Sequence, residues 1–422
     1  MTVVVNGNKK LFLFTESFPF GKGETFIESE IAVLSKHFVE IIIFPRNKVA
    51  EPARDLPPNV KVNFFDLYNQ PYSRLKLVTQ FFVPIVSIFI MQFFLSKHKI
   101  KYLKYFSRYF NDLLNNYNRA LRFDALLFRQ RFKNGIDNFV FYSYWFDVWA
   151  SVISILRYKK KINYIVTKTH GGDLFEERKT EGFFPFRSFY MSQIDSVVSV
   201  SEAGKKYMME KYPKHNKKIF VSHNGVFDYG FNPLNESMSD CFYIVSCSGF
   251  ISLKRVHLIV KILSQLKFKT HWIHFGDGPL RQNIISECLT IFKDNVSFDF
   301  KGHITNKELM SFYQSYSVDM FIHLSETEGL PVSIIEAIGF GIPVIATEVG
   351  GIPEIINEKT GFLLDANPDI ETAVNIISAF KKKYEHDRVA LAEFRFQIRE
   401  EWKRKFRAEE VYGRFAKEIL LK

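Results

Sequence analysis

The feature that most restricts the fold is a strand–loop–helix–strand pattern in the second half of the chain. Residues 318–324 form a short, bounded apolar run, which predicts a buried strand. A polar loop, 325–329, follows, and Pro331 then stands where the first residue of a helix is expected. Residues 342–347 predict the next strand. A strand, a helix and a second strand in this order indicate a parallel sheet covered by helices.

Two carboxylates lie where ligands bind in such sheets, beyond the carboxyl ends of the strands. Glu328 is in the loop, and Glu336 lies about 7.5 Å further along the helix axis than Pro331. Between them the helix N-terminus offers N–H groups at Val332 and Ser333, which suit a phosphate. This order matches the sugar, the diphosphate and the ribose of a nucleotide sugar. Solvated surface acids are the alternative, which the apolar neighbours of Glu336 disfavour.

The run E-G-L-P-V-S-I-I-E, residues 328–336, resembles the two-glutamate motif of the retaining glycosyltransferase 4 family. The resemblance implies the GT-B fold, in which two Rossmann-like domains face each other across the active site. It also implies that Glu328 lies by the donor sugar and that Glu336 holds the ribose. Many members have glycine where this chain has proline, which donates no N–H, so the phosphate contact is expected from the next two residues. The motif residues implied in donor binding are Gly329, Leu330, Pro331, Val332, Ser333 and Glu336.

Two glycines, Gly21 and Gly23, follow a predicted strand and precede a helix that is expected to open at Glu24. Such a pair lets the backbone approach a ligand, although a plain turn is its commoner meaning. The run P-F-G-K-G-E-T-F-I resembles the start of several family members, whose first loop faces the donor phosphates. The resemblance therefore implies that both glycines contact the donor.

His170 ends the predicted strand 163–169 and is followed by two glycines, which places it at the ligand edge of the sheet. A histidine at such a position is more often structural. The run T-H-G-G-D-L is similar to the H-G-x-D segment of the family, whose histidine approaches the transferred sugar, and this implies a catalytic role for His170. Asp173 is alternatively a cap of the following turn.

The loop after the predicted strand 242–249 carries Lys254 and Arg255. Family members usually have an arginine directly after the glycine and a lysine a few residues later, both on the diphosphate. Lys254 matches the lysine and Phe250 replaces the arginine. We expect Arg255 to supply the missing charge, because it can bind a phosphate with two N–H groups. A solvated basic pair is the alternative, but it would oppose the helix dipole.

Two further motifs of the second half resemble the family. G-D-G-P-L, residues 276–280, is expected to form a tight turn with a structural role. His303 and Ile304 follow the predicted strand 296–302, at the position where the family seats the nucleobase.

Thirteen predicted strands divide the 422 residues into two Rossmann-like domains. We expect an N-terminal, acceptor-binding domain over 1–226 and a linker over 227–240. The nucleotide-sugar-binding domain is expected over 241–395. A C-terminal helix, 396–422, is expected to return to the N-terminal domain, as the last helix of GT-B proteins often does.

The net charge of the chain is +12, but residues 1–226 carry 34 Lys and Arg against 19 Asp and Glu, a balance of +15. This excess predicts an anionic neighbour for the first half, such as a membrane surface, a lipid phosphate or nucleic acid.

The N-terminal domain contains a basic and apolar insertion at about 72–132, within which 77–95 is nearly continuously apolar. A membrane span needs roughly 20 such residues but would cut the domain in two. A buried helix pair is the second interpretation. We favour a third, a helix at the membrane interface whose basic flanks face anionic head groups.

Three cysteines, Cys241, Cys247 and Cys288, follow no metal-ligand spacing and cannot all pair, which favours a reducing compartment. The N-terminus lacks the pattern of a secretory leader. We therefore expect a cytoplasmic protein that associates peripherally with the inner face of the cytoplasmic membrane. No clustered acids or His/Cys group predicts a metal site.

Taken together, these motifs predict a retaining, metal-independent glycosyltransferase that needs no cofactor besides its donor, a UDP- or GDP-sugar. The expected acceptor is a lipid-linked glycan or a growing surface polysaccharide, as in capsule or lipopolysaccharide synthesis. A nucleic-acid-binding protein is the alternative from another class. The basic residues interleave with an apolar run rather than with exposed aromatics, so we expect no nucleic acid partner. A sugar-nucleotide epimerase or a phosphorylase of the same architecture is the third possibility.

Overall fold

The computed structural model describes residues 9–21, 23–47, 54–65, 74–96, 98–129, 138–159, 162–234 and 241–422. The chain divides into two compact units, each built on one parallel sheet. Unit 1 consists of Met1–Ser222 together with Tyr412–Lys422, and unit 2 of His223–Val411. The segment predicted as a linker, 227–240, is thus part of unit 2, and its residues 235–240 lie outside the described ones.

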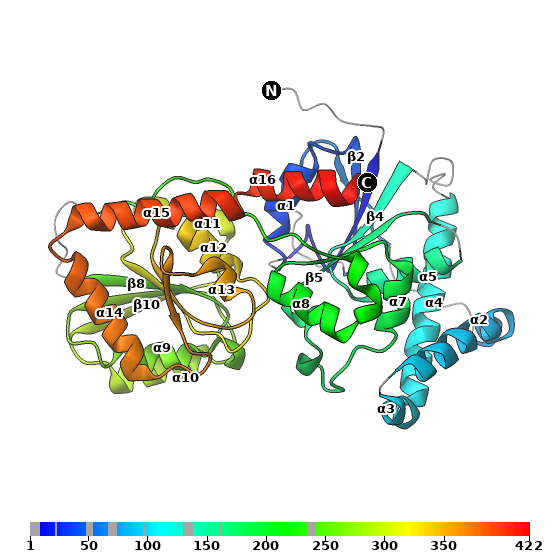
Figure 1. The fold of residues 1–422 in the computed structure, drawn as a ribbon, viewed down its shortest axis with the longest axis horizontal. Helices are drawn as coiled ribbons and strands as arrows, with labels where there is room; N and C mark the ends of the chain where they lie inside the picture. Colours follow the sequence, from blue (N-terminus) through cyan, green and yellow to red (C-terminus); the bar gives the residue numbers. More distant parts are fainter. Residues whose placement is uncertain are drawn as a thin grey trace. The chain divides into compact units, whose positions relative to one another are not determined.

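Unit 1 contains a seven-stranded sheet in the order β3-β2-β1-β4-β5-β6-β7 (Figure 1). Its strands are short runs of apolar residues, as strands buried on both faces require. They are β1 (Lys10–Thr15), β2 (Glu40–Pro45), β3 (Val60–Val62), β4 (Phe139–Ser143), β5 (Ile165–Thr169), β6 (Ser196–Ser199) and β7 (Ile219–Val221). The strand order reverses between β1 and β4, and this switch point is where such sheets bind ligands.

The helices of unit 1 connect these strands, and three of them form the insertion between β3 and β4 (Figure 1). They are α1 (Ile27–Leu34), α2 (Arg74–Leu95), α3 (Lys99–Lys104), α4 (Phe106–Arg129), α5 (Val148–Tyr158), α6 (Gly171–Leu174), α7 (Arg187–Gln193) and α8 (Glu202–Lys211), with the 3-10 segments η2 (Glu176–Arg178) and η3 (Pro213–Lys218).

Each face of the sheet in unit 1 has its own core, because alternate residues of a strand point to opposite faces. On one face Phe12 and Phe14 pack among residues of β2, β4, α4, α5 and α7. The ring centroids of Phe12 and Phe139 lie 4.0 Å apart. On the other face Leu11 and Leu13 pack with α1 and with the last residues of the chain. Part of the high phenylalanine content, 46 residues, therefore fills the first of these cores.

The predicted insertion, 72–132, comprises α2, α3 and α4, while its residues 72, 73, 97 and 130–132 lie outside the described ones. Ile85, Ile88 and Phe89 of α2 are buried in the first core of unit 1. Helix α2 is therefore buried along one side, which agrees with the second of the three interpretations, a buried helix pair. Across the stretches of chain that the structure describes, every helix is too short or too polar to cross a membrane.

Unit 2 contains a six-stranded parallel sheet in the order β10-β9-β8-β11-β12-β13, whose switch point lies between β8 and β11. The strands are β8 (Phe242–Cys247), β9 (Thr270–Phe275), β10 (Val296–Gly302), β11 (Met320–His323), β12 (Val344–Thr347) and β13 (Gly361–Leu364). The helices are η4 (Ser252–Lys254), α9 (Val256–Leu263), α10 (Arg281–Ile291), α11 (Asn306–Ser315), α12 (Val332–Gly339), α13 (Ile352–Ile355), α14 (Ile370–Tyr384) and α15 (Arg388–Phe406). Helices α9, α10 and α14 share one core with the sheet.

The C-terminal segment predicted as one helix is divided between the units. Helix α15 packs on α12 in unit 2, where a Cβ added to Gly339 would lie 3.1 Å from the ring of Trp402. Arg407 then leaves the helical conformation and pairs with Val226, and α16 (Ala408–Phe415) follows. Only Tyr412–Lys422 belongs to unit 1. The prediction that the whole of 396–422 returns to the N-terminal domain was wrong for 396–411.

Two helices begin later than predicted. Pro331 is not the first helical residue but the N-cap of α12, with an extended backbone of φ −71° and ψ 114°. Its carbonyl accepts the first bond of the helix, from the N–H of Ile334 over 3.2 Å. Glu24 does not open a helix either: its φ of 56° is left-handed, and α1 begins only at Ile27.

Candidate functional site

The loops that leave β8 and β11 are tied together at the switch point of unit 2. The N–H of Glu326 donates to the carbonyl of Leu253 over 2.9 Å. Arg255 links the same loops, because its Nε donates to the carbonyl of Leu324 and its Nη2 to that of Ser325, each over 2.8 Å. These bonds fix the positions of the side chains that the two loops carry.

Arg255 therefore has a structural role that the sequence did not indicate. Its backbone is left-handed, with φ 47°, and its Nη2 also donates to the carbonyl of Ala366 over 2.8 Å. Nη1 lies 3.4 Å from the side-chain oxygen of Asn367. These contacts leave no parallel pair of N–H groups for the predicted two-pronged phosphate contact.

Lys254 and Glu328 form the charged centre of the site. The Nζ of Lys254 lies 2.5 Å from the Oε1 of Glu328, and the Nε2 of His323 lies 2.8 Å from the same oxygen. Ser325 Oγ is 2.9 Å from that ring nitrogen. Burial alone raises the pKa of Glu328, but the hydrogen bond with His323 and the charge of Lys254 outweigh it and hold the pKa well below its ordinary value. Glu328 is thus a buried carboxylate that remains ionised at neutral pH.

Gly350, which follows β12, supports the loop that carries Glu328. Its φ is +55°, and a Cβ at this position would lie 1.9 Å from the carbonyl oxygen of Glu328. The N–H of Gly351 donates to the carbonyl of Gly329 over 3.0 Å. Glycine is therefore required at position 350, because the backbone is left-handed and because a Cβ would collide with the carbonyl of Glu328.

The N-terminus of α12 is open. Helix α12 has eight residues and no side-chain cap at Pro331. Among the residues that the structure describes, none accepts a hydrogen bond from the N–H of Val332 or Ser333. Because a helix N-terminus carries partial positive charge, these two N–H groups are suited to an anion.

Glu336 lies deeper in the same helix and is buried. Its Oε1 accepts a hydrogen bond from Asn306 Nδ2 over 2.6 Å. Burial raises the pKa of Glu336 to about 7, against the lowering effect of that hydrogen bond. Burial also raises the pKa of the Cys247 thiol to about 12, and the charge of Glu336 adds to this. The protein thus stabilises the charged form of Glu336 much less than the charged form of Glu328.

His303 and Ile304 lie between β10 and α11, whose first residue is the Asn306 that contacts Glu336. The residues predicted for the nucleobase thus precede, by two and three positions, the residue that contacts the second glutamate. Their contact with a base stays a prediction.

The G-D-G-P-L turn has the structural role that the sequence predicted. The N–H of Phe250 donates to the carbonyl of Asp277 over 3.1 Å, and a Cβ on Gly278 would lie 2.6 Å from the carbonyl oxygen of Phe250. The ring of Phe250 is buried, 4.3 Å from the ring of His274 between centroids. The residue that replaces the family's arginine is therefore part of the core.

In unit 1 the loop after β1 is organised by a carboxylate rather than by its glycines. Glu24 accepts hydrogen bonds from the N–H groups of Ser17 (2.7 Å) and Phe18 (2.6 Å). It also accepts one from the indole N–H of Trp145, in the loop after β4, over 2.6 Å. These hydrogen bonds require the side chain of Glu24 to turn back toward its own loop, and the left-handed backbone of Glu24 allows this.

Gly21 and Gly23 lie in this loop with their carbonyls directed at one cation. Nη2 of Arg54 donates to both carbonyl oxygens, over 2.7 and 2.6 Å. Gly21 has a φ of 73°, which favours glycine. The contact that we predicted between these glycines and the donor stays a prediction.

His170 lies at the end of β5, buried between the rings of Tyr144 and Trp145 at centroid distances of 4.9 and 4.4 Å. Asp173 accepts its backbone N–H over 2.6 Å and so fixes the turn, which is the capping role. In the described part of the chain neither ring nitrogen of His170 has a hydrogen-bond partner. Burial lowers the pKa of His170 well below its ordinary value, and the charge of Lys168 adds to this. His170 is thus a neutral side chain with unsatisfied nitrogens.

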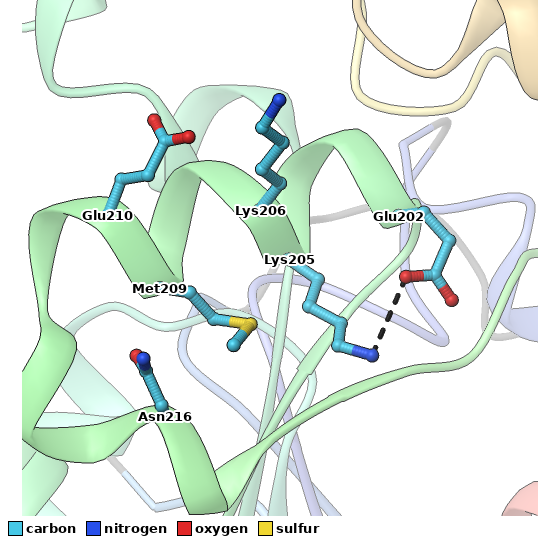
Figure 2. Close-up of a pocket in the computed structure, with 6 residues that line it drawn as sticks. All are labelled: Glu202, Lys205, Lys206, Met209, Glu210 and Asn216. Atoms are coloured by element: carbon cyan, nitrogen blue, oxygen red, sulfur yellow. Dashed lines mark ion pairs between the residues drawn. The ribbon is translucent and has the colours of Figure 1, made fainter.

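Two hollows of unit 1 contain none of the predicted site residues. The first, of about 300 Å³, lies on α8 and η3; Figure 2 shows Lys205 turned toward Glu202, with which it pairs at 3.5 Å. Its lining residues are Glu202, Lys205, Lys206, Met209, Glu210 and Asn216. The second, of about 410 Å³, is lined by residues such as Gln92, His98 and Phe183. Both are bordered by charged or polar residues of unit 1, whereas the glutamate motif belongs to unit 2.

A metal site was not expected. Within the described ranges no three His, Cys, Asp or Glu side chains are grouped so that they could hold a metal ion. Metal independence itself stays a prediction.

Three residues of the unit 2 site were missed in the sequence: His323, Ser325 and Asn306. His323 is a polar residue at the end of an apolar strand, and this signal could have identified it. Asn306 offered no such signal, because T-N-K-E indicates only a capped helix start, which the structure contains at Thr305 and Glu308.

Residues 235–393 match the family model described as glycosyl transferases group 1. One phosphatidylinositol N-acetylglucosaminyltransferase subunit of Arabidopsis thaliana is 26% identical over 212 residues, which cover 48% of this chain and 46% of the relative. An O-antigen biosynthesis glycosyltransferase, WbnH of Escherichia coli, is 25% identical over 203 residues, which cover 48% of this chain and 56% of the relative. The chain thus spans about half of the length of these relatives.

Solved structures resemble the chain over almost its whole length. A sucrose-phosphate synthase from Thermosynechococcus elongatus has a TM-score of 0.67 at 16% identity and covers 97% of both chains. HepE of Anabaena, in complex with UDP-glucose, has a TM-score of 0.64 at 15% identity and covers 97% of this chain and 99% of its own. The predicted fold class, two Rossmann-like domains of the GT-B type, is confirmed by this likeness and by the two parallel sheets.

Proposed function

We propose that this protein is a retaining glycosyltransferase that uses a nucleotide-diphosphate sugar, and the premise is the match of residues 235–393 to the model of the group 1 glycosyl transferases. The observation that carries the proposal is the arrangement at the unit 2 switch point. There Glu328 forms an ion pair with Lys254 just before α12, the N-terminus of α12 has no side-chain cap, and Glu336 lies buried further along the same helix.

The diphosphate is proposed to bind at the N-terminus of α12 and at Lys254. Nζ of Lys254 has three N–H donors, of which Glu328 takes one, so two can reach phosphate oxygens. The N–H groups of Val332 and Ser333 supply two more donors. In the transition state the leaving diphosphate gains negative charge, and donors fixed in advance around it are usually the largest contribution to catalysis.

Glu336 is proposed to hold the ribose. Two vicinal hydroxyls can donate to one carboxylate, and Asn306 fixes the orientation of that carboxylate. Its pKa of about 7 allows it to be charged when a ligand supplies donors. His303 and Ile304, just before Asn306, remain our candidates for the nucleobase contact.

Glu328 is proposed to orient hydroxyls of the transferred sugar, since its carboxylate is fixed and ionised before any ligand binds. His170 is proposed to contact the sugar or a phosphate through a ring nitrogen, and its buried, unsatisfied nitrogens support this. The acceptor hydroxyl would attack the anomeric carbon on the face that the nucleotide leaves. Its proton would pass to the departing phosphate, so that no protein nucleophile is required.

The acceptor is proposed to be a lipid-linked glycan or a growing polysaccharide, on the inner face of the cytoplasmic membrane. The support is the balance of +15 over residues 1–226 and the similarity to an O-antigen biosynthesis glycosyltransferase. A nucleotide-sugar epimerase of the same architecture is the main competitor. Transfer of labelled sugar to a glycan acceptor would separate the two, because an epimerase changes the sugar without an acceptor.

The test is a thermal-unfolding panel of UDP- and GDP-sugars on wild type, Glu336→Ala and a matched control, Glu371→Ala, in which an exposed glutamate of unit 2 is removed. A ligand that binds only the folded state raises stability by about 2.7 kcal/mol at 100 times its Kd. We expect one nucleotide class to do so, the control to respond like wild type, and Glu336→Ala to lose most of the effect. No response of wild type to any nucleotide sugar would refute the proposal.

A further inference from the structure

Helix α2 has an exposed apolar stripe opposite its buried side. Val83, Ile90 and Phe94 are 73%, 48% and 67% exposed, and their spacing of seven and four residues places them on one face of the helix. The residues buried in the core, such as Ile85 and Ile88, lie on the other face. The helix is therefore apolar on both sides, but the core of unit 1 covers only one of them.

The next two elements of the insertion, which contact α2 or follow it directly, also expose apolar side chains. Ile100 and Leu103 of α3 are 81% and 65% exposed, and Phe106 follows at the start of α4. Of the fifteen large hydrophobic side chains that are exposed in the described ranges, seven lie between residues 83 and 106. Scattered exposed hydrophobics need no explanation, but a concentration on adjacent helices marks an interaction surface. We call Val83, Ile90, Met91, Phe94, Ile100, Leu103 and Phe106 the apolar face.

Exposed cations border the apolar face. Lys99 and Lys104 are the first and last residues of α3 and flank its apolar residues, and none of the carboxylates in the described ranges forms an ion pair with either. Lys101, by contrast, is used inside unit 1, where it donates to the carbonyl of Glu181 over 2.6 Å. The surface thus offers apolar side chains for burial and unneutralised positive charge beside them.

We infer that the apolar face docks unit 1 on an anionic phospholipid bilayer, with Phe94, Ile100 and Leu103 in the interface and Lys99 and Lys104 at the head groups. Apolar burial and attraction to anionic lipid are the two contributions that hold interfacial helices on membranes. A second copy of the chain fits less well, because a two-fold contact through this face would bring its lysines near one another. Nucleic acid would satisfy the lysines but leave the apolar residues in water.

This docking deepens the proposed function, because it would bring the enzyme to the plane of a lipid-linked acceptor. The contributions of the two groups of residues can be measured separately. Substitution of Phe94 removes apolar area from the interface and should weaken partition to the bilayer roughly tenfold. Each lysine near an anionic surface should strengthen the same partition roughly fivefold.

The test is sedimentation of the full chain with vesicles of phosphatidylcholine and phosphatidylglycerol, and with vesicles of phosphatidylcholine alone. We expect binding to the mixed vesicles that weakens roughly tenfold in Phe94→Glu. Lys99→Glu/Lys104→Glu should weaken it by roughly twenty-fivefold, fivefold for each lysine, and binding should fall at about 1 M salt. Leu289→Glu, at an exposed apolar residue of unit 2, and Lys206→Glu, at an exposed lysine of α8, are the matched controls and should bind like wild type.

Absence of wild-type binding, or equal binding by Phe94→Glu and its control, would overturn the docking face. So would self-association in solution that Phe94→Glu abolishes without any vesicle binding, which would assign the face to a second copy. Nucleotide-sugar binding by Phe94→Glu is read separately. A variant that binds the nucleotide but not the vesicle supports both claims, whereas a wild type that binds vesicles but no nucleotide refutes only the proposed function.

Discussion

In unit 2 the loops beyond β8 and β11 bring a lysine and a glutamate together as an ion pair at the sheet edge. In unit 1 the loops beyond β1 and β4 use Glu24 to bind their own backbone and an indole, and their other two carboxylates, Glu16 and Asp147, both pair with Arg46. Glu328 has two side-chain partners, Lys254 and His323. Glu24 has backbone N–H groups and an indole, which hold the loop itself. The same kind of switch point therefore carries a lysine–glutamate pair in one unit and loops held together by their own carboxylates in the other.

The two units also differ in where they bury charge. Unit 1 buries a complete ion pair in its core: Lys168 lies 2.7 Å from Glu30, and the two side chains are 0% and 1% exposed. Its ammonium group lies 5.3 Å from the ring centroids of Tyr412 and Phe415, from the last residues of the chain. Unit 2 also buries charge, because Arg395 and Arg399 are 2% and 4% exposed and donate to the carbonyls of Gly341 and Gly339. Its pair at the switch point, Lys254 and Glu328, differs from the buried pair of unit 1 in that 22% and 11% of these two side chains remain exposed.

The largest effect is expected from Lys168→Met, which tests the structural role of charge in unit 1. Removal of one partner of a buried pair costs about 3–5 kcal/mol, because the other charge is left uncompensated. Amide hydrogen exchange of β5 and denaturant unfolding would measure the loss. Because Lys168 lowers the pKa of His170, we also expect the pKa of His170 to rise toward its ordinary value, which NMR titration can detect.

The double variant Glu30→Gln/Lys168→Met is the control for this prediction. It removes both charges, so a large part of the lost stability should return. A single variant that is as stable as wild type would mean that the pair does not organise the core of unit 1.

A somewhat smaller effect is expected from Lys254→Met, which tests the functional role of charge in unit 2. Loss of one fixed positive group at a developing anion lowers the turnover number by about 10²–10³-fold, or about 3–4 kcal/mol. The reason is that the diphosphate then has only the helix N-terminus. The measurement is the rate of sugar transfer at saturating donor, with stability determined in parallel.

Lys381→Met is the matched control, because this lysine also forms an ion pair in unit 2, with Glu385, but away from the switch point. We expect it to transfer sugar at the wild-type rate. If Lys254→Met and Lys381→Met lose the same fraction of the sugar-transfer rate, Lys254 has no more functional importance than an ordinary surface ion pair.

The sheets could be predicted from the sequence because each strand is a bounded apolar run. All thirteen expected strands form, and the two strand orders follow from ordinary Rossmann topology. The glutamates of the site could be predicted because their loop and helix lie in one continuous motif. The family resemblance placed both Lys254 and Glu328 near the donor, but their direct ion pair, between residues 74 apart in sequence, was not predicted.

The side-chain partners could not be predicted, because they depend on which groups are left unsatisfied after folding. Arg255 and Lys254 are adjacent in sequence and alike in charge, yet one contacts backbone carbonyls and the other a carboxylate. Glu24 was expected to start a helix, but the free N–H groups of its own loop compete for its carboxylate. Periodicity carries no information on such competition.

The last comparison is between the two glutamates of unit 2, whose pKa values are displaced in opposite directions. The raised pKa of Glu336 means that the folded state binds a proton that the unfolded state releases, so stability falls as pH rises from about 4.5 to about 7. The lowered pKa of Glu328 means that its stabilising contribution is present above about pH 4.5 and is lost as pH falls.

Glu336→Gln should therefore be more stable than wild type at about pH 8, by at most about 3 kcal/mol, and equal to it at about pH 4.5. Urea unfolding across this range, with Glu371→Gln as the control, measures the difference. If wild type and Glu336→Gln show the same slope, the carboxylate is solvated and cannot be the buried ribose ligand that distinguishes unit 2 from unit 1.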